Sequence, residues 1–148
     1  MNTHPSLRAF LAGILIPTLV LPAMLAAFIV IRLVLLVPVP IERALVFPMA
    51  LVPALWGLWN MLWLHSHERT HLALGPHGAL LPLLLLPGGT LVGTSLGVLT
   101  LGGGGVTWFG AAYLPYALIA PCFLAGLAGY YLVWKYVVGF LNRVLGIA

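Results

Sequence analysis

Long stretches without charged side chains constrain this chain more than any other feature. Ala9 to Ile31 is a run of 23 residues with no ionisable side chain, and Ala44 to Leu64 is a second run of 21. Each charged side chain at the centre of a bilayer costs roughly 2.5 to 3.5 kcal/mol, so charges mark the ends of membrane spans. A 23-residue helix is about 35 Å long, which exceeds the ~30 Å hydrocarbon core. The sequence therefore predicts spans at residues 9–31 and 44–64.

A third uncharged region is too long for one helix. From Leu72 to Trp134 the chain has 63 residues without Asp, Glu, Lys or Arg. Four consecutive glycines at 102–105 each cost a helix about 1 kcal/mol, which predicts a turn between two helices. We therefore expect spans at residues 79–101 and 109–134. Lys135, Asn142 and Arg143 stand among the apolar residues that follow, which predicts a short helix over 135–148 that lies in the interface or extends the fourth span.

The composition supports one polytopic membrane domain over residues 1–148, of the all-α class with four transmembrane helices. Hydrophobic residues make up 63% of the chain and charged residues 5%, whereas a soluble domain carries about 25% charged residues. This composition excludes a nucleic-acid-binding protein, a secreted disulfide scaffold and a disordered chain. The expected partners are therefore membrane lipids and other membrane proteins.

The cations predict the orientation of the four spans. If the spans alternate, one side of the membrane carries both termini and four cations, and the other carries Arg32 and Arg43. The four are Arg8, Arg69, Lys135 and Arg143. Basic residues accumulate on the cytoplasmic side of membrane proteins, so we expect both termini in the cytoplasm. The expected location is the inner membrane of a bacterial cell.

Two sequence patterns bear on how the helices pack. Gly89, Gly93 and Gly97 are spaced four apart, and such small residues let two helix backbones approach closely in a membrane. We expect this stripe to pack inside the chain, with contact to another subunit as the alternative.

The second pattern is a tryptophan stripe at residues 56, 59 and 63, one face of the second span. It could flank a bound pigment, quinone or lipid, and the favoured interpretation is that it packs against other helices or meets membrane lipid.

One segment carries a pattern with catalytic meaning. His67, Glu68 and His71 form HERTH, which matches HExxH, where two histidines on one helix face bind zinc and the glutamate acts as general base. His77 is the candidate third ligand. The segment HERTHLALGPH resembles the HExxHxxGxxH motif of metzincin peptidases, with Gly75 one place late. That resemblance implies a zinc hydrolase with Glu68 as its catalytic residue.

Other features weigh against a peptidase. Apolar spans exclude His and Glu, so these residues concentrate in short loops and HExxH arises there readily by chance. The chain has no expected β-domain to bind an extended substrate, and it has no Asp at all. Intramembrane metalloproteases typically add an Asp ligand from a later span, and this chain cannot supply one.

The leading hypothesis is therefore a small non-catalytic membrane protein, an accessory, assembly or scaffold subunit of a homo-oligomer or larger membrane complex, with no cofactor. One alternative is a membrane-associated zinc metallohydrolase that uses His67, Glu68, His71 and His77. Another is a small lipid or solute carrier, which predicts a continuous polar cavity between the spans. Carriers driven by protons or sodium usually need a carboxylate at membrane depth, and neither Glu42 nor Glu68 is expected there.

Overall fold

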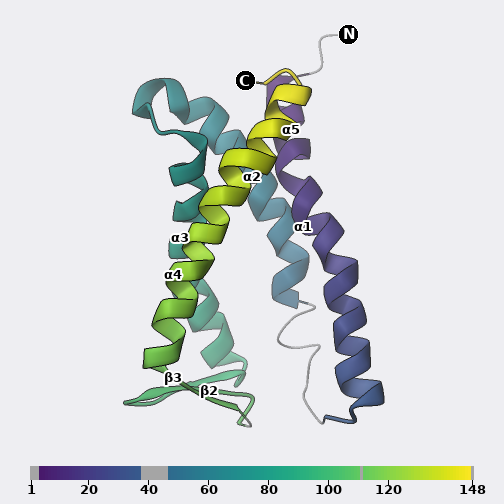
Figure 1. Ribbon diagram of the computed structural model, residues 1–148, viewed down its shortest axis with the longest axis vertical. Coiled ribbons are helices and arrows are strands. Elements are labelled where there is room, and N and C mark those ends of the chain that lie inside the picture. The colour runs from purple at the N-terminus through teal and green to yellow at the C-terminus, as the bar shows by residue number, and fades with distance from the viewer. Residues whose placement is uncertain (1–3, 38–46, 111, 148) are drawn as a thin grey trace.

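The computed structural model describes residues 4–37, 47–110 and 112–147, and these residues form four helices and a small sheet. Figure 1 shows the helices running lengthwise and the sheet closing one end. The first helix is α1 (Pro5–Ile29), which continues as the π-helical turn η1 (Val30–Val34). The next two are α2 (Phe47–Thr70) and α3 (Leu74–Ser95). The last runs without a break through α4 (Tyr116–Leu132), η3 (Val133–Val138) and α5 (Gly139–Val144).

Three helical stretches are long and apolar enough to cross a membrane: Pro5–Val34, Leu74–Ser95 and Tyr116–Val144. Their large apolar side chains are mostly exposed, as at Leu19, Leu91 and Leu124, which expose 65 to 72% of their surface. Water would disfavour so much exposed apolar surface, whereas lipid would not. α2, which carries Asn60 and ends in HSHERT, is not among the three. Residues 44–46 of the expected second span lie outside the described residues.

The prediction of an all-α fold is wrong between residues 96 and 115. Here the chain forms an antiparallel sheet with strand order β1-β2-β3. Its strands are β1 (Leu99–Leu101), β2 (Gly105–Trp108) and β3 (Ala112–Pro115). The sequence predicts a helix over the residues of β1 because three apolar or β-branched residues that follow a helix show no periodicity that distinguishes a strand. The chain reverses at the predicted glycines, but Gly102, Gly103 and Gly104 join two strands, β1 and β2, instead of two helices, and Gly105 belongs to β2.

The ends of two predicted spans shift for identifiable reasons. α3 ends at Ser95 because Gly97 adopts a left-handed backbone (φ +67°) and the Val98 N–H donates to the Gly93 carbonyl at 2.8 Å. This is the bonding of a glycine-terminated helix. The last helix begins at Tyr116 instead of Phe109 and continues to Val144. The segment from residue 135 therefore extends the last helix, which is the second of the two alternatives, and does not form a separate interfacial helix. Trp134 and Val138, both fully buried, hold it in the bundle.

The helices associate as two pairs. α1 packs along α2, while α3 packs along α4 and η3. A small core joins the pairs, formed by Trp56, Leu81, Trp134 and Val138. Both termini and the α2–α3 turn lie at one end of the bundle, which we call the terminal end, and η1 and the sheet lie at the other, the sheet end (Figure 1).

Candidate functional site

Two buried asparagines join the first, second and last helices. Asn60 in α2 and Asn142 in α5 are both fully buried. Asn60 Nδ2 donates to Asn142 Oδ1 at 2.8 Å, and Asn142 Nδ2 donates back to Asn60 Oδ1 at 3.2 Å. Asn60 Nδ2 also donates to the Ala9 carbonyl in α1 at 2.8 Å. A buried amide without a hydrogen-bond partner costs free energy in an apolar interior. These bonds therefore fix how α1, α2 and α5 are positioned along one another.

His77 connects α3 to α2 in a similar way. The His77 Nε2–H donates to the Trp59 carbonyl at 3.0 Å, and the Trp59 indole N–H donates to the His77 carbonyl at 2.8 Å. The two rings stack with centroids 4.6 Å apart. Because a carbonyl can only accept, this bond places the proton on Nε2 and leaves that nitrogen without a lone pair for a metal.

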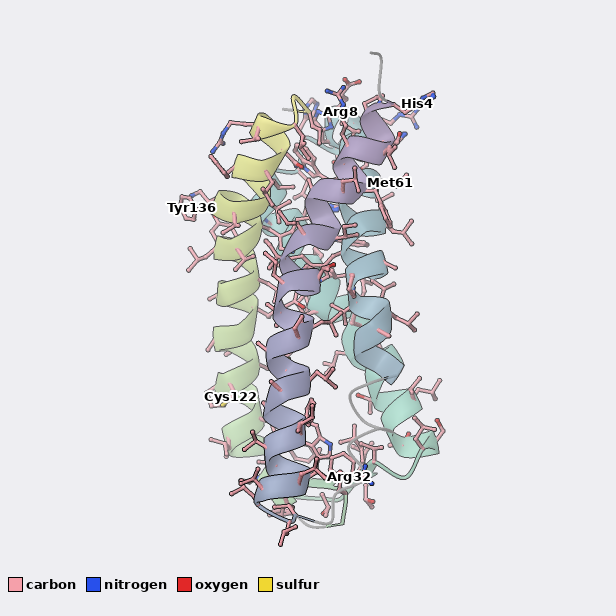
Figure 2. All side chains as sticks on the ribbon, turned by 90° about the vertical axis from the view of Figure 1, so that its right-hand side faces the viewer. His4, Arg8, Arg32, Met61, Cys122 and Tyr136 are labelled. Carbon is pink, nitrogen blue, oxygen red and sulfur yellow. The ribbon has the colours of Figure 1, made fainter. Side chains whose placement is uncertain are left out.

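Arg8 closes the terminal end of the bundle. Its Nη1 donates to the Leu145 carbonyl at 2.8 Å, just beyond the last turn of α5. The last carbonyls of a helix have no partner within the helix and carry partial negative charge, which a guanidinium satisfies. Figure 2 shows His4 and Arg8 at this end and Arg32 at the other. The first and last helices are thus joined near both termini.

The HERTH segment lies at the end of α2. Glu68 is in the last turn, α2 ends at Thr70, and His71 follows with a left-handed backbone of φ +51°. The His67 Nδ1–H donates to the Leu64 carbonyl at 2.9 Å, and its ring stacks on Trp63 with centroids 4.7 Å apart. His67 and His71 therefore do not both project from the same regular helix, which the HExxH motif requires.

The structure does not bring the proposed zinc ligands together. Among residues 4–37, 47–110 and 112–147, no three side chains of His, Cys, Asp or Glu lie close enough to hold a metal ion. His77 instead lies between α2 and α3 in its bonds with Trp59. The zinc site and the catalytic role of Glu68 stay predictions from the motif, to be tested by metal analysis of the purified protein.

The glycine stripe of α3 does not pack against a helix of this chain. A Cβ added to Gly89 would meet no atom within 4 Å, and one added to Gly93 would meet the Leu99 side chain of β1. Gly97 lies beyond the end of the helix. Gly88, beside Gly89, is equally open. Gly93 therefore packs inside the chain, against β1 and not against a helix, while for Gly89 contact with another subunit stays the prediction.

Close helix packing occurs at other glycines, which no motif in the sequence marks. A Cβ on Gly13 of α1 would lie 2.6 Å from the Trp56 carbonyl oxygen of α2, and one on Gly57 would lie 2.5 Å from the Phe10 ring. Gly75 and Gly78 of α3 face Tyr131 and Trp134 in the same manner. No regular spacing links Gly13 to Gly57, so only the paired helices reveal this contact.

The tryptophan stripe faces the interior, so of the two favoured possibilities, packing and contact with lipid, the structure has packing. Trp56 and Trp63 are buried, with 6 and 8% of their surface exposed, and Trp59 packs against the core. The Trp56 ring lies 5.2 Å from the Trp134 ring and 5.3 Å from the Tyr130 ring. Most of this stripe therefore stabilises the helix bundle.

One side of Trp56 also borders a pocket of about 320 Å³ between α1, α2 and α4. We call it the α1–α4 groove and define it by six of its lining residues: Ile16, Pro17, Val20, Trp56, Gly126 and Gly129. Its lining is almost entirely apolar. It therefore does not resemble the continuous polar cavity expected of a solute carrier.

Comparison with known proteins assigns no family or function to the chain. No protein-family model matches the chain, and neither a curated protein nor a solved structure shows significant similarity to it.

Proposed function

We propose that this protein is a non-catalytic integral membrane protein of four spans, and that it acts as an accessory, assembly or scaffold subunit of a homo-oligomer or larger membrane complex. The observation that carries the proposal is the use of the interior polar side chains as ties between helices. The side chains of Asn60, Asn142 and His77 each form hydrogen bonds with a neighbouring helix.

This use of polar groups favours a structural role. A reaction centre needs a polar or charged side chain that can approach a substrate, next to a second group that activates it. Asn60 and Asn142 bond to each other and are fully buried, so a substrate would have to displace their mutual bonds. What these bonds supply is a defined register of α1, α2 and α5, which suits a protein that presents a fixed surface.

The open glycines of α3 supply a surface for a partner. Gly88 and Gly89 lie within a candidate span and have no described protein atom within 4 Å of a Cβ built on them. A helix of another chain could approach the α3 backbone closely at these two positions, which is how small residues support helix association in lipid. The partner would be another membrane helix, from a second copy or from a different subunit.

The arrangement of the ends supports a four-span topology with cytoplasmic termini. α2 has 24 residues, about 36 Å of helix, and packs along α1, so it is long enough to serve as the fourth span. Arg8, Arg69 and Arg143 belong to elements that reach the terminal end, whereas Arg32 lies at the sheet end. The excess of basic residues favours the terminal end as the cytoplasmic one. Arg43 lies outside the described residues.

Labelling of single cysteines tests the topology. In a Cys122→Ser background, Ser66→Cys places a thiol at the terminal end and Gly103→Cys places one at the sheet end, where a Cβ meets no atom within 4 Å. In intact spheroplasts, a membrane-impermeant maleimide should label Gly103→Cys and should label Ser66→Cys only after lysis. Labelling of both, or the reverse pattern, would contradict the proposed orientation.

Cross-linking in native membranes tests the association. In the same background, Gly88→Cys and Gly89→Cys should form disulfides with another chain on mild oxidation, visible as a mass shift in non-reducing gels. Leu19→Cys is the matched control, because Leu19 is 69% exposed on the lipid-facing side of α1. If Gly88→Cys and Gly89→Cys cross-link no more than Leu19→Cys, the α3 surface is not an interface and the scaffold proposal fails.

A further inference from the structure

The three strands divide their side chains between two chemically different faces. Antiparallel partners place their side chains on the same face of a sheet, and successive residues of a strand alternate between the faces. Trp108 lies opposite Leu99 on one side and opposite Ala112 on the other, which assigns every residue of the sheet to a face. One face, which we call the apolar face, consists of Leu99, Leu101, Val106, Trp108, Ala112 and Leu114.

The opposite face, which we call the hydroxyl face, carries Thr100, Thr107 and Tyr113 as a row across the three strands. Gly105 and Pro115 complete it. No side chain on either face is charged, and residues 96–115 contain no Asp, Glu, Lys or Arg. An antiparallel sheet with one apolar and one polar face normally buries the apolar face and leaves the polar face in water.

The helix bundle covers only part of the apolar face. Leu99 lies against α3, since its side chain occupies the space that a Cβ on Gly93 would need. This contact turns the apolar face toward the helices. Leu101 and Trp108, on the same face, remain 53 and 39% exposed. The side of the sheet that faces the bundle therefore carries apolar surface that the helices leave open.

The sheet is attached at both ends to candidate membrane spans. Only residues 96–98 separate α3 from β1, and α4 begins at Tyr116, directly after β3. With 22 residues, α3 is about 33 Å long, which matches the ~30 Å hydrocarbon core. The strands lie crosswise to the helices at their ends (Figure 1). The lipid that surrounds α3 and α4 in a bilayer is therefore next to the open part of the apolar face.

Backbone and side-chain chemistry together set the depth of the sheet. Among the described strands, β1 and β3 each have a paired neighbour on one side only. Open strand edges do not occur in lipid hydrocarbon, because their N–H and C=O groups would lack partners. A surface in bulk water normally carries charged side chains, and this sheet has none. The headgroup layer meets both conditions, and Trp and Tyr, present here as Trp108 and Tyr113, accumulate at that level.

We propose that the three-stranded sheet is a membrane-surface element whose partner is the phospholipid leaflet at the sheet end. The apolar face enters the boundary between headgroups and acyl chains, and the hydroxyl face contacts headgroups and water. The inference depends on insertion of the bundle in a bilayer. It does not depend on membership of a larger complex or on which end is cytoplasmic.

Spin labels at two adjacent residues on opposite faces test the proposal. In a Cys122→Ser background, Leu101→Cys and Thr100→Cys each carry a nitroxide at an exposed position of β1. The full-length labelled protein is placed in nanodiscs of phosphatidylethanolamine and phosphatidylglycerol. Electron paramagnetic resonance then measures collisions of the label with oxygen, which concentrates in lipid, and with a water-soluble nickel chelate. The oxygen-to-nickel collision ratio should be several-fold higher for Leu101→Cys than for Thr100→Cys.

Equal ratios at the two positions would overturn the proposal, because both faces would then lie in the same medium. Few collisions with either reagent at Leu101→Cys would also overturn it, since protein would then cover the apolar face. Leu19→Cys, on the exposed side of α1, is the reference for insertion. A low ratio at Leu19→Cys would reject insertion of the bundle itself, whereas a high ratio there with equal ratios in β1 would reject only the placement of the sheet.

The fluorescence of Trp108 supplies a second arm that needs no added label. The difference in emission between the unaltered protein and Trp108→Phe isolates the signal of Trp108, and phenylalanine keeps the apolar ring that the fold needs. Bromine atoms on acyl-chain carbons near the headgroup should quench this difference signal more than bromine atoms near the chain ends or acrylamide in the water. Stronger quenching by acrylamide, or by bromine near the chain ends, would overturn the proposal.

Discussion

The region around Gly13 and Gly57 and the region around Gly126 and Gly129 use the same residue in opposite ways. At Gly13 and Gly57, the backbones of α1 and α2 lie so close that a Cβ would overlap the other helix. At Gly126 and Gly129, a Cβ would meet nothing, and the helices stand apart around a groove. Glycine in a membrane helix therefore marks either a contact or a gap, and only the position of the neighbouring helix decides which.

The largest loss of stability should come from placing a side chain between α1 and α2 at Gly13. Gly13→Leu would force a side chain against the Trp56 carbonyl and Gly57 backbone, neither of which can move away without separating the helices. Overpacking of an interior costs about 1 to 3 kcal/mol and more where backbone obstructs, so we expect a loss of about 3 kcal/mol of stability. The readout is the thermal unfolding midpoint in detergent, followed by size-exclusion chromatography.

Gly126→Leu is the matched control for that experiment, because its Cβ would enter open space and it lies outside the proposed subunit contact at Gly88 and Gly89. It should leave the unfolding midpoint close to that of the unaltered protein. Equal destabilisation by Gly13→Leu and Gly126→Leu would contradict the role of close packing at Gly13, because leucine has the higher helix propensity at both positions.

A smaller loss of stability should follow from breaking the Asn60–Asn142 pair, which lies on the terminal side of the contact between Gly13 and Gly57. Asn60→Leu leaves the buried Asn142 amide without its partner, which we expect to cost about 1 to 3 kcal/mol. The double variant Asn60→Leu/Asn142→Leu removes both amides and should cost less than the sum of the two single changes. A double-mutant cycle on unfolding midpoints measures this coupling.

Strict additivity in the cycle would contradict a direct Asn60–Asn142 bond. The double variant would then behave as two unrelated substitutions, and the register of α2 and α5 would rest on packing at Trp134 and Val138 alone.

The smallest effect should come from the terminal end itself. Arg8→Gln shortens the side chain and removes the charge that meets the Leu145 carbonyl, which we expect to cost about 0.3 to 1 kcal/mol. Hydrogen exchange should report the loss locally, as faster exchange in residues 139–147 with little change in α3. Equal acceleration in α3 would show that Arg8 supports the whole bundle and not only the end of α5.

Much of the helical architecture could be predicted from residue chemistry. Charges delimit the uncharged stretches because an ion at mid-depth is costly, and α1 and the helical part of residues 79–101 follow from that rule. The sheet could not be predicted in the same way. Apolar strands of three or four residues next to apolar helices carry the same signal as the helices, and only the pairing of Leu99 with Trp108 and of Gly105 with Pro115 distinguishes them.

The candidate site also combines features that the sequence reveals with features that only the structure reveals. Asn60 is visible in the sequence as a polar residue inside a span, but nothing nearby indicates its partner, which is 82 residues away. His77 attracts attention as a metal ligand because of its spacing from His67, yet its ring stacks on Trp59 in α2. In both cases the residue type is informative and its partner is set by which helices come together.

The sequence by itself determined that this chain carries long apolar helices with its charges at their ends, because the cost of placing a charge in hydrocarbon is a property of each residue alone. Only the tertiary structure decided that Gly13 lies against Gly57, that Asn60 bonds to Asn142, and that Gly126 and Gly129 border an open groove. In lipid, apolar surfaces have no general preference for one another over the solvent, so specific packing and a few hydrogen bonds choose the partners.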